Sequence, residues 1–459
     1  MNNIFKGALA LALTLSLSGC HIYKKYETPT DTPLTKSYAE ALAQEPDSTA
    51  FGNLPWQEVF TDPVLVDLIN RALANNTDLR NAQLNVEAAQ AQVLGAKLAY
   101  LPSVALAPNG AGAKYASNDF SWTYQLPAQV SWEVDIFGKL LNNKRSAQVA
   151  LIQTEAYAQA VRSQIISAVA TTYYTLSAVK QQLALSRSTS ELWKETVNTM
   201  RDLKEAGRTT EAAVMQSEAS YFSILGSITD LETSIVSLNN TMSLLLNVMP
   251  TTWEVPADAV LNAPAFASRG VEMAMLAARP DVAAAEMDLA KAYYATNLAR
   301  AAFYPGLTIT ANGGFTNLLG SFIQNPGDWF VQLAGSLVAP IFSRGRNIAN
   351  LRASKAMQQS ALNSFEYTLL SAASEVSNAL TVYDRSIEKA GFLRSQVSDL
   401  EQALTMTKDL FTYSTGNVDY LNVITAQQSL LGAQISLIDC NLARYRSVIN
   451  LYQALGGGR

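Results

Sequence analysis

Four segments of the chain alternate apolar and polar side chains, a pattern typical of β-strands. In the clearest, residues 122–136, every second position is apolar, and the positions between are polar apart from one proline. Residues 307–316 and 329–341 alternate in the same way, and residues 103–115 form a weaker, glycine-rich fourth segment. A strand points successive side chains to opposite faces, so each segment has one apolar and one polar face. Their lengths match the roughly 9–11 residues with which a tilted strand crosses a bilayer, which predicts membrane strands.

Aromatic residues lie near the ends of these segments, as in the girdles of membrane barrels: Tyr115, Phe120, Trp122, Phe315 and Trp329. The alternative interpretation is a soluble two-sheet sandwich, in which the same apolar faces pack on a core. Four strands do not close a barrel, for which about eight is the practical minimum. Open strand edges in a bilayer leave backbone groups without partners. The membrane interpretation therefore predicts assembly with further copies of the chain, giving eight, twelve or sixteen strands for two, three or four subunits.

The rest of the chain carries apolar residues at helical spacings of three and four. Leu362, Phe365, Leu369 and Ala373 begin one such series, which is typical of a coiled-coil seam. Residues 139–206 contain no proline, which predicts a helix of about 100 Å. Two shorter helices laid end to end match its length, so the sequence predicts a tube of packed helices.

One unit occurs twice along the chain. Asp78 and Asp281 each open a helix, Pro102 and Pro305 each end one, and both pairs are 203 residues apart. Each proline precedes a strand, a loop, a second strand and a long helix that breaks at a glycine. Such a self-match indicates a duplication. It divides the chain into an N-terminal segment with an equatorial region (20–77), a first repeat (78–247, hairpin 103–136), a connector (248–278), a second repeat (279–455, hairpin 305–341) and a tail (456–459).

The N-terminus has the pattern of a signal peptide, predicted over residues 1–19. Lys6 precedes a short apolar run, residues 8–17, and the run leads into Leu17-Ser18-Gly19-Cys20, which resembles a bacterial lipobox. We therefore expect cleavage before Cys20 and covalent lipid on that residue, because several acyl chains anchor a protein firmly. A chance cysteine after an ordinary signal sequence is the alternative. His21 follows, and it gives no signal for retention at the inner membrane.

Composition argues against enzyme chemistry. The chain has one histidine, two cysteines and a net charge of −5, with a pI near 5.2. A zinc site or a histidine-based triad is therefore not expected, and neither a phosphate-binding loop nor a basic stretch for nucleic acid is present. We predict no enzyme activity, no metal and no cofactor other than the lipid on Cys20. Cys440 is interpreted as a small helix residue.

Several motifs together resemble the TolC-like outer membrane factors, in particular their drug-efflux lipoprotein branch. They are Trp56-Gln57-Glu58-Val59-Phe60-Thr61-Asp62-Pro63, Trp132-Glu133-Val134-Asp135-Ile136-Phe137-Gly138-Lys139, Tyr413-Ser414-Thr415-Gly416, Ala426-Gln427-Gln428-Ser429-Leu430 and Asn450-Leu451-Tyr452-Gln453-Ala454-Leu455. The resemblance covers nearly the whole mature chain. It implies a mainly α fold with membrane β-strands, that is, a homotrimeric 12-stranded outer-membrane β-barrel with four strands per chain, continued by a periplasmic α-helical coiled-coil barrel.

The resemblance also implies a function and partners. The chain is expected to be the outer membrane exit duct of a tripartite efflux system, carrying drugs and toxic compounds from an inner-membrane pump and a periplasmic adaptor. Lipoprotein export and the barrel place it in the outer membrane of a Gram-negative cell, lipid-anchored, with a large periplasmic portion. The alternatives are a duct for protein (type I) secretion and a non-conducting, structural coiled-coil surface lipoprotein.

Two sites follow from the same resemblance. The adaptor-docking tips are Gly207, Arg208, Thr209, Gly416, Asn417 and Val418. The periplasmic gate maps to Leu421, Thr425 and Gln428. The alternative is that each tip glycine serves only to form a turn that requires a positive φ. Drug-efflux relatives carry a carboxylate where Thr425 stands and an arginine where Gln428 stands, so a charged lock is not expected. Asp419, the nearest acid, is either part of a cation-binding ring or a solvated tip residue.

Overall fold

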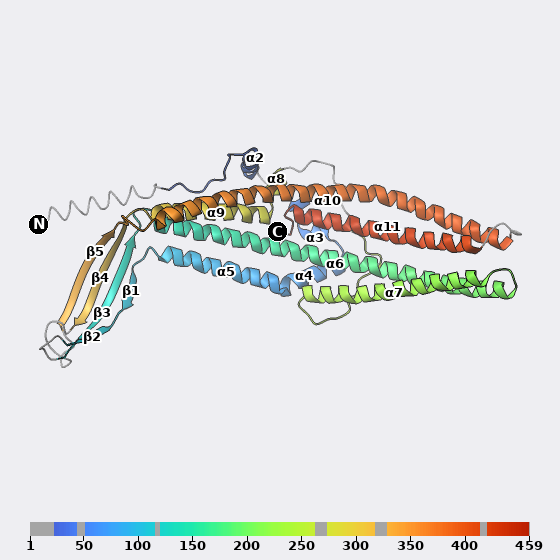
Figure 1. Cartoon of the computed structure of the whole chain (residues 1–459), viewed down its shortest axis with the longest axis horizontal. Coiled ribbons are helices and arrows are strands. Elements are labelled where there is room, and N and C mark those ends of the chain that lie inside the picture. Colours follow the sequence, from blue (N-terminus) through green and yellow to red (C-terminus); the bar gives the residue numbers. More distant parts are fainter. Residues whose placement is uncertain are drawn as a thin grey trace. The chain divides into compact units, whose positions relative to one another are not determined.

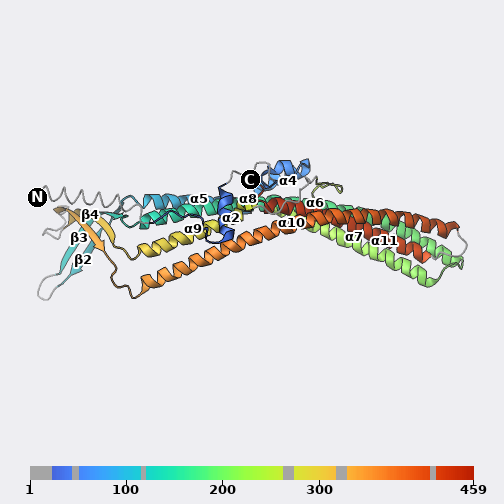
Figure 2. The same cartoon turned by 90° about the horizontal axis from the view of Figure 1, so that it is seen from above.

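The computed structural model describes residues 23–43, 51–114, 120–261, 273–316, 328–413 and 420–458. They divide into two compact units, each containing segments from both halves of the chain. Figures 1 and 2 show the helices and strands from two directions. Unit 1 comprises Met1–Lys36, Leu84–Ala156 and Ala283–Thr368. Unit 2 comprises Ser37–Gln83, Tyr157–Val282 and Leu369–Arg459. The strands belong to unit 1, and the two return helices belong to unit 2.

The strands of unit 1 form one antiparallel sheet in the order β1-β3-β4-β5, with β2 also paired to β3. Their bounds are β1 Ser103–Leu106, β2 Asn109–Ala113, β3 Ser121–Val134, β4 Gly306–Thr316 and β5 Asp328–Val338. The sheet joins the two halves of the duplication through β3 and β4, where Val130 pairs with Ala311. The four expected strand segments are therefore present, and together they form a single sheet.

The expected strand over residues 103–115 is divided into β1 and β2. Pro108 lies between them and has no backbone N–H to donate. The N–H of Ala107 still donates to the carbonyl of Pro127 at 3.0 Å, so the segment follows β3 throughout. The expected strand over residues 329–341 ends at Val338, two residues before Pro340. Proline explains both departures from the sequence-based bounds.

The sheet has two different open edges. Among the described residues, β5 pairs only with β4, whereas β1 and β2 pair only with β3. On β5, Trp329, Val331, Leu333 and Leu337 occupy alternate positions of one face, and all four are exposed in the single chain. An exposed apolar face of this kind marks a surface that contacts a membrane or another protein, and unpaired strand edges favour pairing with a further strand.

The helices repeat in pairs of nearly equal length. Both α5 (Thr77–Leu98) and α9 (Pro280–Ala301) have 22 residues. The long helices α6 (Lys139–Glu205) and α10 (Arg346–Tyr413) have 67 and 68 residues. Both return helices, α7 (Glu211–Leu245) and α11 (Tyr420–Ala454), have 35. The duplication predicted from the sequence is confirmed at the level of individual helices. No helix in the described ranges is long and apolar enough to cross a membrane.

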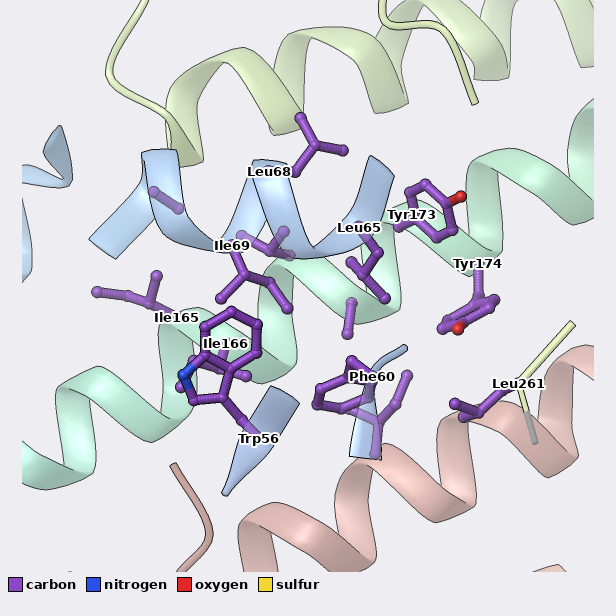
Figure 3. Packing of buried hydrophobic residues seen from close by; sticks show 14 of the residues in the cluster. Trp56, Phe60, Leu65, Leu68, Ile69, Ile165, Ile166, Tyr173, Tyr174 and Leu261 are labelled. Carbon is purple, nitrogen blue, oxygen red and sulfur yellow. The ribbon is translucent and has the colours of Figure 1, made fainter. Parts of the chain in front are cut away.

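The described residues also form short elements: α2 (Pro33–Leu42), η2 (Phe51–Asn53), α3 (Trp56–Val59), α4 (Pro63–Asn75) and α8 (Met273–Ala277). Helices α3 and α4 carry much of the core of unit 2, which they form with α6 (Figure 3). Trp56, Phe60, Leu65 and Tyr173 are almost completely buried there. Asp62 caps α4 through the backbone N–H of Val64 and Leu65, and the hydroxyl of Tyr173 donates to the same carboxylate at 2.7 Å. Burying large aromatic side chains is among the strongest stabilising contributions available to a core.

The described chain begins as an extended segment held on the helices of unit 1. The backbone N–H of Tyr26 donates to the hydroxyl of Tyr294, and Thr28 donates to Glu286 at 2.5 Å. Further along, the hydroxyl of Thr32 donates to Glu366 at 2.8 Å. These contacts join the residues that follow the predicted lipid site to α9 and α10. Cys20 itself lies outside the described residues.

Candidate periplasmic gate and docking tips

The predicted gate residues share the exposed face of α11 near its first turn. Leu421, Thr425 and Gln428 are exposed, whereas Val423 and Ile424 are buried. Spacings of four and three residues place side chains on one side of a helix. The three side chains therefore lie on one face of α11, and their role as a gate stays a prediction.

A hydrogen bond joins this face to the other helical hairpin. The side-chain amide Nε2 of Gln428 donates to Oγ of Ser220 on α7 at 2.9 Å. The hydroxyl of Thr425 donates within its own helix, to the carbonyl of Leu421 at 2.9 Å. Neither residue carries charge, so the contact between α11 and α7 at this level is neutral. Ser220, which lies 208 residues away in sequence, was not a predicted site residue.

A small core lies behind the gate face. Trp193 of α6, Ile224 of α7 and Ile424 of α11 are buried against one another. Beside them a groove of about 620 Å³ lies between α7 and α11, with Ser220, Gln428 and Gly432 in its wall. This cluster contains far fewer residues than the core around Trp56. Few apolar contacts therefore hold the two hairpins together near the tips.

The first tip is a tight turn between α6 and α7. Gly207 has a φ of +67°, a left-handed conformation that favours glycine. The N–H of Arg208 donates to the carbonyl of Leu203 at 2.8 Å, and the N–H of Gly207 donates to that of Lys204 at 2.9 Å. This is the usual glycine-terminated end of a helix. Thr210 then caps α7 by accepting from the N–H of Ala213.

The tip presents polar and charged side chains to solvent. Arg208 is exposed and Thr209 is partly buried, while Lys204 forms an ion pair with Glu211 across the turn. No heavy atom lies within 4 Å of the position that a Cβ of Gly207 would occupy. The surface is therefore open to a partner. The residues of the second tip, Gly416, Asn417 and Val418, lie outside the described residues, as does Asp419.

Sequence reasoning missed a buried arginine in unit 2. The side chain of Arg279 is 6% exposed. Its Nε and Nη2 donate to the two carboxylate oxygens of Asp281 at 3.0 and 2.7 Å. Nη2 also donates to Glu375 of α10 at 2.7 Å, and Nη1 donates to the carbonyl of Ala454 of α11 at 2.8 Å. One guanidinium thus joins the start of α9 to both helices of the second hairpin.

The electrostatics of this cluster favour its charged form. Burial acts to lower the pKa of Arg279, but the hydrogen bonds that it donates to Asp281 and Glu375, together with their negative charges, raise its pKa above the usual value. Burial acts to raise the pKa of Asp281, but Arg279 and the backbone N–H of Val282 together hold it below its usual value. The arginine lines a cavity of about 880 Å³ between α6, α10 and α11. The sequence Arg279-Pro280-Asp281 marked the start of a helix, but it gave no sign of the distant partners.

The described residues contain no group of three or more His, Cys, Asp or Glu side chains arranged to hold a metal ion. Cys440 is buried, and its thiol donates to the carbonyl of Ser386 at 3.4 Å. This contact fits the interpretation of Cys440 as a helix residue packed against α10.

Comparisons with known proteins agree on one family. The profile described as outer membrane efflux protein matches residues 68–248 and 273–457. The chain belongs to the outer membrane efflux protein family. It is 28% identical to "Probable outer membrane lipoprotein SilC" of Salmonella typhimurium, over 98% of both chains. It is 30% identical to "Probable efflux pump outer membrane protein SepC" of Pseudomonas putida, over 98% of this chain and 96% of that one.

The fold matches solved structures of the same kind. The structure of the outer-membrane channel OprN superimposes with a TM-score of 0.84 and 25% identity, over 95% of this chain and 99% of that one. The expected resemblance and fold class, that of the trimeric outer membrane channels, are therefore confirmed. The chain is the outer membrane exit duct of a tripartite efflux system, located in the outer membrane with a large periplasmic portion. Members of the family are channels.

Proposed function

We propose that this exit duct is a homotrimer that conducts small molecules, without enzyme activity, from a dedicated inner-membrane pump and periplasmic adaptor. Two features support the proposal. The sheet of one chain has two different open edges, β5 on one side and β1 with β2 on the other, which further copies of the chain pair in a closed barrel. Relatives such as SepC are named as parts of efflux pumps. The outer membrane lipid is the remaining partner, and no nucleic acid takes part.

The gate is the exposed face of α11 that carries Leu421, Thr425 and Gln428. The single observation that carries this assignment is the neutral hydrogen bond from Gln428 to Ser220, which ties α11 to α7 at the level of that face. In a three-fold tube, Leu421 of each copy points at the axis and forms a dry constriction. Asp419, two residues before Leu421 in the sequence, is the nearest acidic residue and belongs to the proposed gate.

The adaptor docks on the two tips. Gly207, Arg208 and Thr209 form an open, polar turn with no side chain above the glycine. Gly416, Asn417 and Val418 are the corresponding residues of the second repeat. A larger side chain at position 207 would keep the tip of a partner helix away from the backbone. Docking and turn formation therefore both favour glycine at this position.

The trimer is tested by mass. Light scattering of the detergent-purified protein, corrected for detergent, is expected to give three times the mass of the mature chain, because only further copies pair the strand edges. The full-length chain has a mass of 49.6 kDa. A monodisperse monomer that still conducts in a planar bilayer would refute the trimer while leaving the channel function in place.

The lipid anchor is tested at Cys20. In Cys20→Ala we expect export without acyl chains, and retention in the membrane by the barrel alone. Intact-mass spectrometry of the wild-type protein is expected to show a mature N-terminus at residue 20 with covalent lipid. A mature N-terminus elsewhere, with an unmodified Cys20, contradicts the prediction. Cys440→Ala serves as the matched control, since Cys440 is buried and carries no lipid.

A further inference from the structure

The junction between the sheet and the helices of unit 1 is rich in basic residues. Helices α5 and α9 end beside the strands, and α6 and α10 begin there (Figure 1). We name residues 97–102, 133–145, 300–305 and 339–352 the collar. The collar contains eight basic and two acidic residues, although the whole chain has a net charge of −5. The basic residues are Lys97, Lys139, Lys144, Arg145, Arg300, Arg344, Arg346 and Arg352.

The two repeats carry positive charge at equivalent places in the collar. Lys97 and Arg300 are 203 residues apart, which is the offset of the repeat at this point. Lys139 lies five residues after the end of β3, and Arg344 lies six residues after the end of β5. The basic character of the collar is therefore a feature of both halves of the duplication.

Most of this charge is not neutralised by the chain itself. Lys139 forms an ion pair with Glu133 at 2.7 Å. The carboxylate of Asp135 accepts the backbone N–H of Leu141 at 2.7 Å. The other seven basic side chains have no ion pair within the described part of the chain. Copies related by rotation carry the same excess at the same height, so the collar of one copy does not neutralise that of another.

Two helix dipoles add to the positive potential. Helix α6 begins at Lys139 and α10 begins at Arg346, and neither helix has an acidic residue in its first turn. The start of a helix carries a partial positive charge, so basic side chains are unfavourable there in the absence of an anion. The starts of both long helices therefore favour an external anion.

The end of β3 that leads into the collar belongs to the exposed apolar face of the sheet. Directly paired residues lie on the same face of a sheet. Trp132 of β3 pairs with Ile309 of β4, and Leu307 of β4 pairs with Leu337 of β5. Leu307 and Ile309 are two residues apart and share a face. Trp132 therefore lies on the same apolar face as Leu337, and such a face of a membrane barrel contacts lipid.

Lys144 lies close to this face. The indole Nε1 of Trp132 donates to the carbonyl of Tyr100 at 2.9 Å. The ammonium of Lys144 lies 5.8 Å from the centroid of the Tyr100 ring. Tyrosine and tryptophan side chains are enriched at the boundary between membrane and water. These contacts place a lysine without an acidic partner in the described chain at that boundary.

Arg145 lies beside the segment that follows the predicted lipid site. Its Nη1 donates to the carbonyls of Tyr23 and Lys24, at 3.1 and 3.4 Å. Its Nε and Nη2 donate to no atom of the described residues. Tyr23 lies only three residues after Cys20, and the exposed side chains of Lys24 and Lys25 add two further positive charges.

We propose that Lys144 and Arg145, together with Lys24 and Lys25, bind the phosphate head group of an anionic phospholipid at the periplasmic surface of the outer membrane. The proposal rests on the proposed barrel and names the class of lipid that contacts it. Guanidinium and ammonium groups are the usual donors to phosphate. A cluster of them beside an apolar, lipid-facing surface attracts lipids with net negative charge.

The test compares two lipids with the same acyl chains. The detergent-purified full-length protein is mixed with equal amounts of dioleoyl phosphatidylglycerol, which is anionic, and dioleoyl phosphatidylcholine, which has no net charge. Native mass spectrometry then counts the molecules of each lipid that stay bound. The wild-type protein is expected to retain several-fold more phosphatidylglycerol. Higher ionic strength is expected to reduce this ratio, because exposed charges are screened.

Variants of Lys144 separate a charge effect from a structural one. Lys144→Gln is expected to lower the ratio at least two-fold, whereas Lys144→Arg is expected to keep it. Lys194→Gln is the matched control, because Lys194 is an exposed lysine of the same helix, fifty residues further along. Lys24→Gln with Lys25→Gln removes two exposed charges and is also expected to lower the ratio. General destabilisation would reduce the binding of both lipids and leave the ratio unchanged.

An unchanged ratio in Lys144→Gln, with the trimer intact, would overturn the inference, as would an equal fall in Lys194→Gln. Inorganic phosphate that displaced phosphatidylglycerol better than chloride of equal ionic strength would show a site for free anions and would overturn the lipid assignment. A wild-type protein that conducts normally but binds both lipids equally would overturn the inference and leave the proposed function in place. A monomer without conductance would contradict the proposed function itself.

Discussion

In the Leu421→Ser variant, single-channel conductance in a planar bilayer is expected to rise several-fold, and cells are expected to admit large antibiotics such as vancomycin. Leu421 is 42% exposed on the face of α11 that also carries Thr425 and Gln428. Three leucines that meet on a three-fold axis exclude water, whereas three serines bind it. Since closure then depends on packing, the closed state of the wild-type channel is expected to be insensitive to ionic strength, unlike a lock of exposed ion pairs.

A matched control is Leu244→Ser. Leu244 is an exposed leucine of α7, 78% exposed and close to the end of that helix away from the tip. The control variant is expected to conduct like the wild type, with trimer and expression intact. Unchanged conductance in Leu421→Ser, with an intact trimer, would place the constriction elsewhere, and Asp419 would be the next residue to replace.

A second variant separates the leucine from the hydrogen bond. Ser220→Ala removes the acceptor of Gln428 and leaves Leu421 in place. One neutral hydrogen bond contributes about 0.5–1.5 kcal/mol, so a smaller rise in conductance is expected than in Leu421→Ser. The order of the two effects therefore tells whether apolar packing or the hydrogen bond dominates closure.

Local signals explain why most elements are predictable from the sequence. The first long helix, expected over residues 139–206, is observed as Lys139–Glu205, because Gly207 ends it through a left-handed turn. The described strand segments were recognisable from their alternating apolar and polar residues, because each strand has one apolar face. The duplication was visible because equivalent residues are separated by nearly constant offsets.

Contacts between distant segments explain what was not predictable. The pairing of β3 with β4 is set by assembly of two hairpins, and no local pattern specifies it. Gln428 was selected as a gate residue, but its partner Ser220 is 208 residues away. Arg279 bonds Glu375 and Ala454, which are 96 and 175 residues away. Hydrogen bonds between residues so far apart in the sequence leave no periodic pattern that a single sequence would reveal.

The second large effect is expected at Arg279. In Arg279→Met, the carbonyl of Ala454 loses its donor, and Asp281 and Glu375 lose their common cation. Hydrogen bonds to charged groups contribute about 1.5–3 kcal/mol each. The carboxylates of Asp281 and Glu375 are about half exposed, so water solvates them once the arginine is gone. The folded protein is therefore expected to lose about 2–4 kcal/mol of stability per chain, less than if one partner of a fully buried ion pair were removed. The midpoint temperature of trimer unfolding, followed by circular dichroism, is expected to fall.

Arg279→Lys is the matched control for charge. Lysine keeps the positive charge but lacks the planar fork that bonds Asp281, Glu375 and Ala454 together. Its midpoint temperature is expected to lie between those of the wild type and Arg279→Met. A midpoint for Arg279→Met equal to that of the wild type would mean that the cluster does not hold the start of α9 to the second hairpin.

The same cluster predicts a dependence on acid. The folded pKa of Asp281 lies below its usual value, so its ion pair stabilises the protein fully above the unfolded pKa of about 3.9. This stabilisation is lost as the pH falls through the lower, folded pKa. The difference in unfolding midpoint between the wild type and Asp281→Asn is therefore expected to be constant near neutral pH and to shrink only in strong acid. A difference that instead grew on acidification would show that burial, which raises the pKa of Asp281, outweighs Arg279.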